Sequence, residues 1–215
     1  MKTLLYVSAN SKTEEKSSSK TVARALVNAL LEQDNTINLQ EVDLYKDHIP
    51  KIKGCYFEGR SALLSQEKRS GLTEEEQKEV ENVEALCDQF VQADIVILAS
   101  PMWSLSFPAP VKEYFDCVVQ VGKSMEFKGQ MPHGLLDDKE RHFVYVQSSG
   151  GEIPLVLRPT LNRGLNYIKD LVKFLGMSDF YELLVDGTGK TEAERQEAMQ
   201  KAEEKIPKLC EKILS

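Results

Sequence analysis

Three consecutive serines, Ser17-Ser18-Ser19, lie between a short apolar run and a segment with helical periodicity. Serine hydroxyls and the free N–H groups of a first helical turn bind phosphate well, and the positive end of the helix dipole adds to the attraction. The alternative is that one serine only caps the helix. Because three serines exceed what a cap needs, the sequence favours an anion site in the loop of residues 8–19.

A second loop suits a flat ligand. Residues 95–99 form an unbroken apolar run, as expected of a strand buried on both faces of a parallel sheet. An aromatic ring and backbone amides at the end of such a strand are where open α/β sheets bind planar ligands. The alternative is an ordinary loop in which Trp103 only fills the core. The residues that follow the run are Pro101, Met102, Trp103, Ser104 and Leu105.

A third loop, Ser148-Ser149-Gly150-Gly151, follows another apolar run. Glycine adds no side chain, so the backbone there can approach a ligand closely. Alone this pattern indicates no more than a tight turn. Together the three loops offer a phosphate site, an apolar platform and close backbone amides, which suits a phosphorylated tricyclic ring better than a small metabolite.

The elements that must position these loops alternate between apolar runs and amphipathic segments, a pattern typical of βαβ units. Strands are predicted at residues 3–8, 37–42, 95–99, 142–146 and 180–185. Helices are predicted at residues 20–31, 73–92, 111–119, 161–175 and after residue 191, with capping boxes at Thr73 and Thr191. A short helix is expected near residues 61–68, and residues 120–138 form a long polar connection.

This alternation predicts an α/β fold with a five-stranded parallel sheet. Right-handed crossovers and a ligand loop in the middle of the sequence favour the strand order 2-1-3-4-5. The sequence contains no repeat or linker, so residues 1–215 are predicted to form a single domain.

The composition disfavours two classes of binding partner, nucleic acids and membranes. The net charge of −7 disfavours nucleic acid. No apolar run approaches the ~18 residues of a membrane span, so no membrane partner is predicted, and the N-terminus is better suited to a first strand than to a signal peptide. The cysteines are far apart and are expected to be buried, reduced thiols in a cytoplasmic protein: Cys55, Cys87, Cys117 and Cys210.

Two other kinds of site are not supported. Residues 187–191, Gly-Thr-Gly-Lys-Thr, lack the earlier glycine of a nucleotide P-loop and are better interpreted as a strand-to-helix turn. The three histidines have no helical metal spacing, so no metal site and no catalytic histidine are predicted: His48, His133 and His142.

On these residues the chain resembles the FMN-dependent NADH-azoreductase and quinone reductase family over most of its length. The family's Pro-Met-Tyr-Asn-Phe-x-x-Pro loop is similar to residues 101–108, its Ser-x-Ser phosphate loop to residues 17–19, and its Ser-Arg-Gly-Gly turn to residues 148–151. Residues 122–136 are similar to its active-site loop, with Phe127 at an aromatic position. The three loops in this order are specific, whereas any one of them is not.

The resemblance implies a flavodoxin-like three-layer sandwich with tightly bound FMN. Hydride would pass from NADH to flavin N5, NAD would leave, and hydride would then pass to a quinone or an aromatic azo compound. Backbone amides would face flavin N1 and O2, with no catalytic side chain, and Trp103 and Phe127 would line the substrate slot. The resemblance also implies a homodimer with two sites at the subunit interface.

The chain departs from the family pattern at three positions. Ser104 stands where Asn is usual, Leu105 where Phe is usual, and Ser149 where Arg is usual, so contacts to the ring and substrate preference change. The alternative function is a flavodoxin-type electron carrier without turnover of its own. The long loop of residues 8–19 argues against it, because flavodoxins use a short Thr-rich turn.

Overall fold

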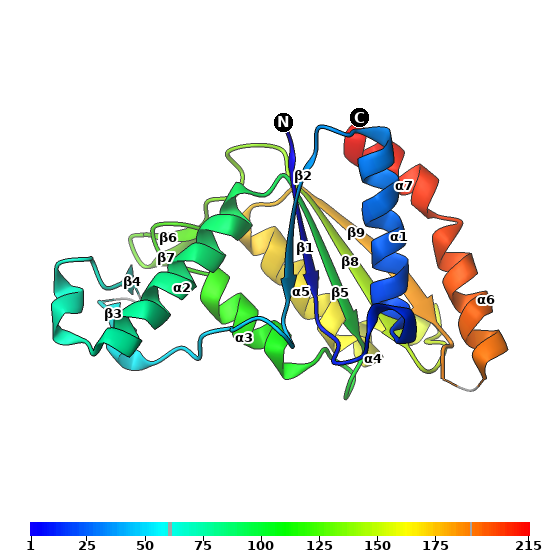
Figure 1. Ribbon diagram of the computed structural model, residues 1–215, viewed down its shortest axis with the longest axis horizontal. Coiled ribbons are helices and arrows are strands. Elements are labelled where there is room, and N and C mark those ends of the chain that lie inside the picture. Colours follow the sequence, from blue (N-terminus) through cyan, green and yellow to red (C-terminus); the bar gives the residue numbers. More distant parts are fainter. Residues whose placement is uncertain (60–61, 190) are drawn as a thin grey trace.

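A parallel sheet forms the centre of the computed structural model, which describes residues 1–59, 62–189 and 191–215 (Figure 1). Its strands run in the order β2-β1-β5-β8-β9, and all four neighbouring pairs are parallel. The predicted order 2-1-3-4-5 is therefore confirmed. The strands are β1 (Thr3–Ser8), β2 (Asn38–Asp43), β5 (Ile95–Pro101), β8 (His142–Ser149) and β9 (Asp179–Asp186).

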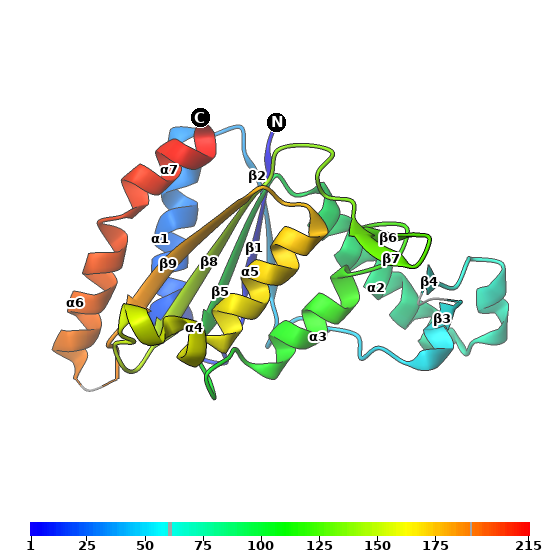
Figure 2. The same ribbon diagram turned by 180° about the vertical axis from the view of Figure 1, so that it is seen from behind.

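Helices cover both faces of this sheet and complete a three-layer sandwich (Figures 1 and 2). One face carries α1 (Ser18–Gln33), α6 (Glu192–Glu203) and α7 (Ile206–Leu214); the other carries α2 (Glu74–Gln92), α3 (Ala109–Val118) and α5 (Arg163–Leu175). Every residue of β5 and β8 is buried, as the unbroken apolar run at residues 95–99 predicts for a strand covered on both faces. A short helix, α4 (Arg158–Leu161), precedes α5.

Helix ends follow local chemistry. The Thr73 capping box is complete, with the hydroxyl accepting from the Glu76 N–H and the Glu76 carboxylate accepting from the Thr73 N–H. At Thr191 the hydroxyl accepts from the Glu194 N–H, and the Glu194 carboxylate contacts that hydroxyl. The last helix predicted from the sequence is divided into α6 and α7, with a proline in the first turn of α7.

Two connections contain hairpins that the sequence analysis did not predict. Of the short helix expected near residues 61–68, residue 61 lies outside the described residues. In the described part of this range, β4 (Ala62–Leu63) pairs with the preceding β3 (Phe57–Glu58) as a hairpin. A turn of 3₁₀ helix follows at Lys68–Gly71, so the expectation of a short helix at residues 61–68 is wrong. The polar connection after α3 contains β6 (Met125–Lys128) and β7 (Met131–Gly134).

The cysteines follow the prediction at three of four positions. Cys87, Cys117 and Cys210 are buried free thiols, whereas Cys55, just before β3, is exposed, with its Sγ 3.7 Å from the Glu76 carboxylate. Among the described helices, none is both long enough and apolar enough to cross a bilayer.

Candidate functional site

The three predicted loops meet at the carboxyl edge of the sheet, because β1, β5 and β8 are adjacent and parallel. Two backbone hydrogen bonds tie their starts together. The Ala9 N–H donates to the Ala99 carbonyl (2.8 Å), and the Met102 N–H donates to the Ser148 carbonyl (2.7 Å). The register of the sheet therefore sets the relative height of all three loops.

The serine loop is compact and already hydrogen-bonded. Ser17, Ser18 and Ser19 are all buried, and Ser17 is the N-cap of α1, with its Oγ accepting from the Lys20 N–H (3.4 Å). The Asn10 amide also donates to that Oγ (2.9 Å). Ser17 is thus a helix cap, as in the alternative that one serine only caps the helix. The first turn of α1 still has N–H groups that lack an intrahelical partner and can bind an anion. Asn10 is a residue that the sequence analysis missed.

An ion pair holds this loop to the end of β2. The Lys20 ammonium, on a residue only 4% exposed, lies 2.9 Å from the Asp43 carboxylate. It also donates to the carbonyls of Asn10 (3.5 Å) and Lys12 (3.4 Å). Burial alone would raise the pKa of Asp43, but hydrogen bonds from Lys20 and from the Tyr45 N–H outweigh it and lower that pKa. Lys20 therefore fixes the loop, a role that no motif indicated.

The second loop is a tight turn in a rare backbone conformation. The Trp103 N–H donates to the Ser106 carbonyl (3.0 Å), and the Ser106 N–H donates back to the Trp103 carbonyl (2.8 Å). Between them Ser104 and Leu105 have φ values of 50° and 63°. Two consecutive left-handed residues without glycine are strained, and such strain is concentrated at functional sites. The turn leaves the N–H groups of Ser104 and Leu105 outside its own pair of hydrogen bonds.

The Trp103 ring is a surface group. It is 48% exposed, and its nearest aromatic neighbour is Tyr45, edge-on with ring centroids 6.5 Å apart. The alternative that Trp103 fills the core is therefore wrong. In Figure 1 the loop between β5 and α3 extends beyond the carboxyl edge of the sheet, where a flat ligand can reach it.

A buried polar network supports the loops from beneath. The Ser100 and Tyr145 hydroxyls are 2.8 Å apart, and the Gln147 amide donates to the Tyr145 hydroxyl (3.2 Å). Gln147 and Asn162 exchange two amide hydrogen bonds (3.1 and 2.5 Å), and Asn162 caps α5. Burial raises the pKa of Tyr145 to about 12, so its hydroxyl stays protonated and available to this network.

The third loop presents its backbone. The Ser149 hydroxyl lies 2.7 Å from the Asp186 carboxylate and 2.7 Å from the Gly151 carbonyl, so it contacts β9 and its own loop. Gly150 and Gly151 are exposed beside it. Ser148 contributes its carbonyl to the Met102 N–H.

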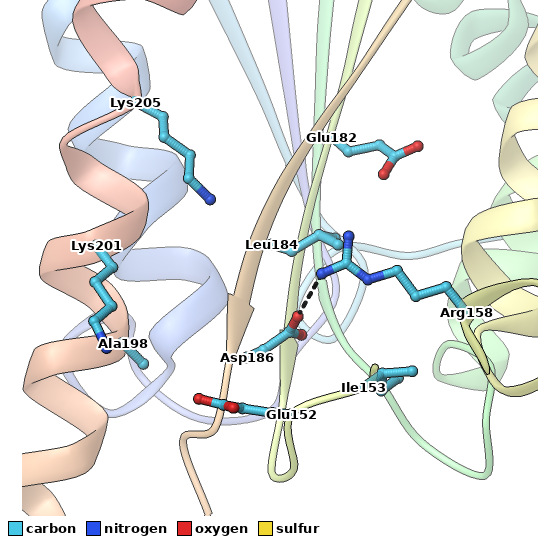
Figure 3. Close-up of a pocket in the computed structure, with 9 residues that line it drawn as sticks. All are labelled: Glu152, Ile153, Arg158, Glu182, Leu184, Asp186, Ala198, Lys201 and Lys205. Atoms are coloured by element: carbon cyan, nitrogen blue, oxygen red, sulfur yellow. Dashed lines mark hydrogen bonds and ion pairs between the residues drawn. The ribbon is translucent and has the colours of Figure 1, made fainter. Parts of the chain in front are cut away.

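A cavity of about 320 Å³ lies beyond this loop, along the outer side of β9 (Figure 3). Three carboxylates and three cations line it, and the Arg158 guanidinium donates to the Asp186 carboxylate (3.3 Å). It shares no residue with the three loops but adjoins the third one, because Asp186 contacts the Ser149 hydroxyl and Glu152 follows Gly151. Its lining is Glu152, Ile153, Arg158, Glu182, Leu184, Asp186, Ala198, Lys201 and Lys205.

Phe127 lies away from Trp103 within one chain. Phe127 is on the β6–β7 hairpin, whose Gly134 packs against the last residues of α5. The turn that holds Trp103 packs against Gly164, at the start of α5. These two ends of α5 are separated by ten residues, or about 15 Å at 1.5 Å per residue. A single chain therefore does not bring the two predicted slot residues together.

The chain is similar to known proteins in both its sequence and its fold. A family model described as a flavodoxin-like fold matches residues 2–209. The chain is 60% identical to the FMN-dependent NADH:quinone oxidoreductase of Ruminiclostridium cellulolyticum over 213 residues, covering 99% of this chain and 100% of that one. It is 49% identical to the FMN-dependent NADH:quinone oxidoreductase of Clostridium botulinum (strain Eklund 17B / Type B) over 214 residues, again covering 99% and 100%.

Among solved structures, an FMN-dependent NADH-azoreductase from Bacillus anthracis in complex with FMN superposes with a TM-score of 0.82 at 25% identity, covering 98% of this chain and 100% of that one. Sequence and structure agree along nearly the whole length. The chain belongs to the FMN-dependent NADH:quinone oxidoreductase family, within the flavodoxin-like fold.

Proposed function

We propose that this protein is an FMN-dependent NADH:quinone oxidoreductase that also reduces aromatic azo compounds. The observation that carries the proposal is the 60% identity, over nearly the full chain, to a relative of that name. The azo activity is supported by structural neighbours named as azoreductases. When bound, the flavin supplies the hydride chemistry between NADH and the acceptor.

The residues present fit FMN. The first turn of α1 at residues 17–19 is suited to the terminal phosphate, because its N–H groups and the helix dipole favour an anion. The N–H groups of Ser104 and Leu105, which lie outside the two hydrogen bonds of the turn, are suited to the polar edge of the ring, where they would stabilise developing negative charge. Pro101, Met102 and Trp103 would supply the platform, and the backbone at residues 148–151 the close contact on the other side.

We infer that the active enzyme is a homodimer. An apolar run at Leu155, Val156 and Leu157 lies on the surface, with Val156 87% exposed, and such groups need cover. Because Phe127 and Trp103 lie at opposite ends of α5, the slot is complete only if Phe127 of the partner subunit closes it. Sedimentation equilibrium at micromolar concentration should give twice the mass of one chain, and a monomer there would contradict the shared site.

We also infer that residues 1–215 form one FMN-binding domain and that the protein is cytoplasmic. The five-stranded sheet takes its strands from residues 3–186, and α7 packs back on α1. Free thiols at all four cysteines suit a reducing compartment. Limited proteolysis should leave a fragment that spans the sheet, whereas two stable fragments would indicate two domains.

The cofactor assignment is tested by releasing the flavin and identifying it by chromatography. FMN is expected, since the serine loop is suited to a terminal phosphate, which FMN has and FAD lacks; FAD as the main species would contradict the assignment. In the double variant Ser17→Ala/Ser19→Ala, each lost charge-assisted hydrogen bond should cost about 1.5–3 kcal/mol of FMN binding. Ser70→Ala, at an exposed serine outside the loops, is the control. Unchanged affinity in the double variant would place the phosphate elsewhere.

Kinetics separate the enzyme from the electron carrier. If one slot serves both substrates in turn, double-reciprocal plots at several menadione concentrations should be parallel; intersecting plots would contradict the shared slot. Phe127→Ala should slow the turnover of flat aromatic acceptors while FMN stays bound. The lost ring stacking should raise the activation free energy by about 0.5–1.5 kcal/mol, in addition to the loss from the smaller buried area. One-electron exchange with a partner protein, without steady NADH oxidation, would favour the flavodoxin-type carrier.

A further inference from the structure

Three side chains that can ligate a metal gather at the amino edge of the sheet, opposite the cofactor loops. His142 is the first residue of β8, and Asp179 is the first residue of β9 and its register partner. Glu140 lies in the turn just before β8. At about 3.3 Å per residue, the length of β8 puts these groups about 23 Å from Ser149 at the other edge. The cluster is therefore independent of the FMN site.

His142 is buried with one ring nitrogen unused. The residue is 5% exposed, and among the described residues its Nδ1 has no hydrogen-bond partner. The Asp179 carboxylate lies 3.6 Å from Nδ1, which is too long for a hydrogen bond. A buried polar atom without a partner is costly, so this nitrogen calls for a ligand that the protein alone does not provide. Burial lowers the pKa of His142.

The spacing suits a metal ion placed between the two groups. Ligand atoms about 2.1 Å from a tetrahedral ion are about 3.4 Å apart, close to the observed 3.6 Å between Nδ1 and the Asp179 oxygen. The Glu140 carboxylate lies 4.0 Å from Nε2, on the other side of the same ring, so its side chain, which is 73% exposed, would have to change rotamer to reach an ion at Nδ1. One ligand atom from each of the three residues lies within 4.8 Å of the others.

We propose that Glu140, His142 and Asp179 bind a divalent cation of the zinc type, with water completing the coordination. One imidazole with two carboxylates is a ligand set that suits Zn²⁺, whereas Ca²⁺ and Mg²⁺ favour oxygen ligands alone. The two carboxylates neutralise the ion. Two cations lie nearby: the Lys2 ammonium donates to the Ile213 carbonyl (3.3 Å), and the Lys212 ammonium lies over the Tyr181 ring, which stacks on His142.

Such an ion would cross-link the starts of β8 and β9. Because β9 is an edge strand whose one strand neighbour is β8, a metal at its first residue would add a link to that neighbour besides the backbone hydrogen bonds. The site is structural in this proposal and takes no part in hydride transfer.

The test is titration of the full-length FMN-bound protein, freed of metals by chelation, with ZnCl₂ by calorimetry. Co²⁺ serves as a second probe, read by its visible absorption. One ion per chain is expected. Glu140→Gln, at an exposed side chain, should fold normally and weaken Zn²⁺ binding at least tenfold, as should Asp179→Asn, and His142→Gln should abolish it. The melting temperature should rise with Zn²⁺ in the wild type, rise less at the same Zn²⁺ concentration in Glu140→Gln, and stay unchanged in His142→Gln.

Two controls locate the ion. His48→Gln removes an exposed histidine whose Nε2 lies 2.7 Å from the Glu79 carboxylate, and Glu81→Gln removes an exposed carboxylate on α2. Both variants should bind Zn²⁺ as the wild type does. The proposal is overturned if the wild type takes up no stoichiometric ion, if Glu140→Gln and Asp179→Asn bind normally, or if His48→Gln abolishes binding. FMN content, measured in the same samples, should be unchanged throughout, so this outcome is separate from the proposed function.

Discussion

The ion pair between Lys20 and Asp43 should govern both folding and cofactor affinity. In Lys20→Met the ammonium that lies 2.9 Å from the carboxylate is lost, as are its contacts to the carbonyls of Asn10 and Lys12. Removing one partner of a fully buried pair costs about 3–5 kcal/mol, because the other charge is left uncompensated. The Asp43 side chain is still 18% exposed and has Lys46 at 3.4 Å, so we expect about 2–3 kcal/mol here, below that range.

Urea denaturation of the FMN-free protein, followed by circular dichroism, measures this change in the free energy of unfolding. Lys16→Met, at an exposed lysine in the same loop, should stay within about 0.5 kcal/mol of the wild type. Adding Asp43→Asn to Lys20→Met should recover part of the loss, because the uncompensated charge disappears. FMN affinity of Lys20→Met should fall about tenfold, or 1.4 kcal/mol, since the serine loop is no longer fixed. A Lys20→Met protein as stable as Lys16→Met would refute the reasoning.

Three further predictions concern the same edge of the sheet. The pKa of Asp43 is lower in the folded protein than the ordinary 3.8. Its contribution to the free energy of unfolding is therefore present above about pH 4 and is lost as the pH falls through the folded pKa. The unfolding curves of the wild type and of Asp43→Asn should converge on acidification. Ser104→Asn should stabilise the protein slightly, because Asn tolerates positive φ, whereas Ser104→Val should destabilise it by about 1–3 kcal/mol, and equal melting temperatures for the two variants would argue against strain at this turn. A Cβ on Gly164 would come within 2.9 Å of the Ser106 backbone, so Gly164→Ala should cost about 1–3 kcal/mol and weaken FMN binding, while Gly71→Ala, which meets open space, should do neither.

Much of the fold could be predicted because burial leaves a direct trace in the sequence. The unbroken apolar run at residues 95–99 is typical of a strand covered on both faces, and the alternation at residues 37–42 indicates the edge strand β2. The Thr73 capping box fixed the start of α2. Because the strands of the predicted sheet are parallel, the loops that follow three of them were expected at the same edge of the sheet.

The features that could not be predicted depend mostly on contacts between residues far apart in the sequence. Nothing local shows that Lys20 pairs with Asp43, or that Asn10 donates to Ser17, since these groups meet only after β1, β2 and α1 are packed. The positive φ values at Ser104 and Leu105 are also invisible, because neither residue favours that conformation. The division between α6 and α7 and the two short hairpins involve elements too short for a periodic signal.

The network of Ser100, Tyr145, Gln147 and Asn162 joins the carboxyl edge of the sheet to the start of α5 through fully protein-made hydrogen bonds. Because these hydrogen bonds all join groups of the protein, we expect this part of the edge to form without the cofactor. Folding and cofactor loading then become separable events, so the chain can complete its fold first and acquire FMN afterwards. Protein stripped of flavin should regain it by simple addition, without passing through the unfolded state.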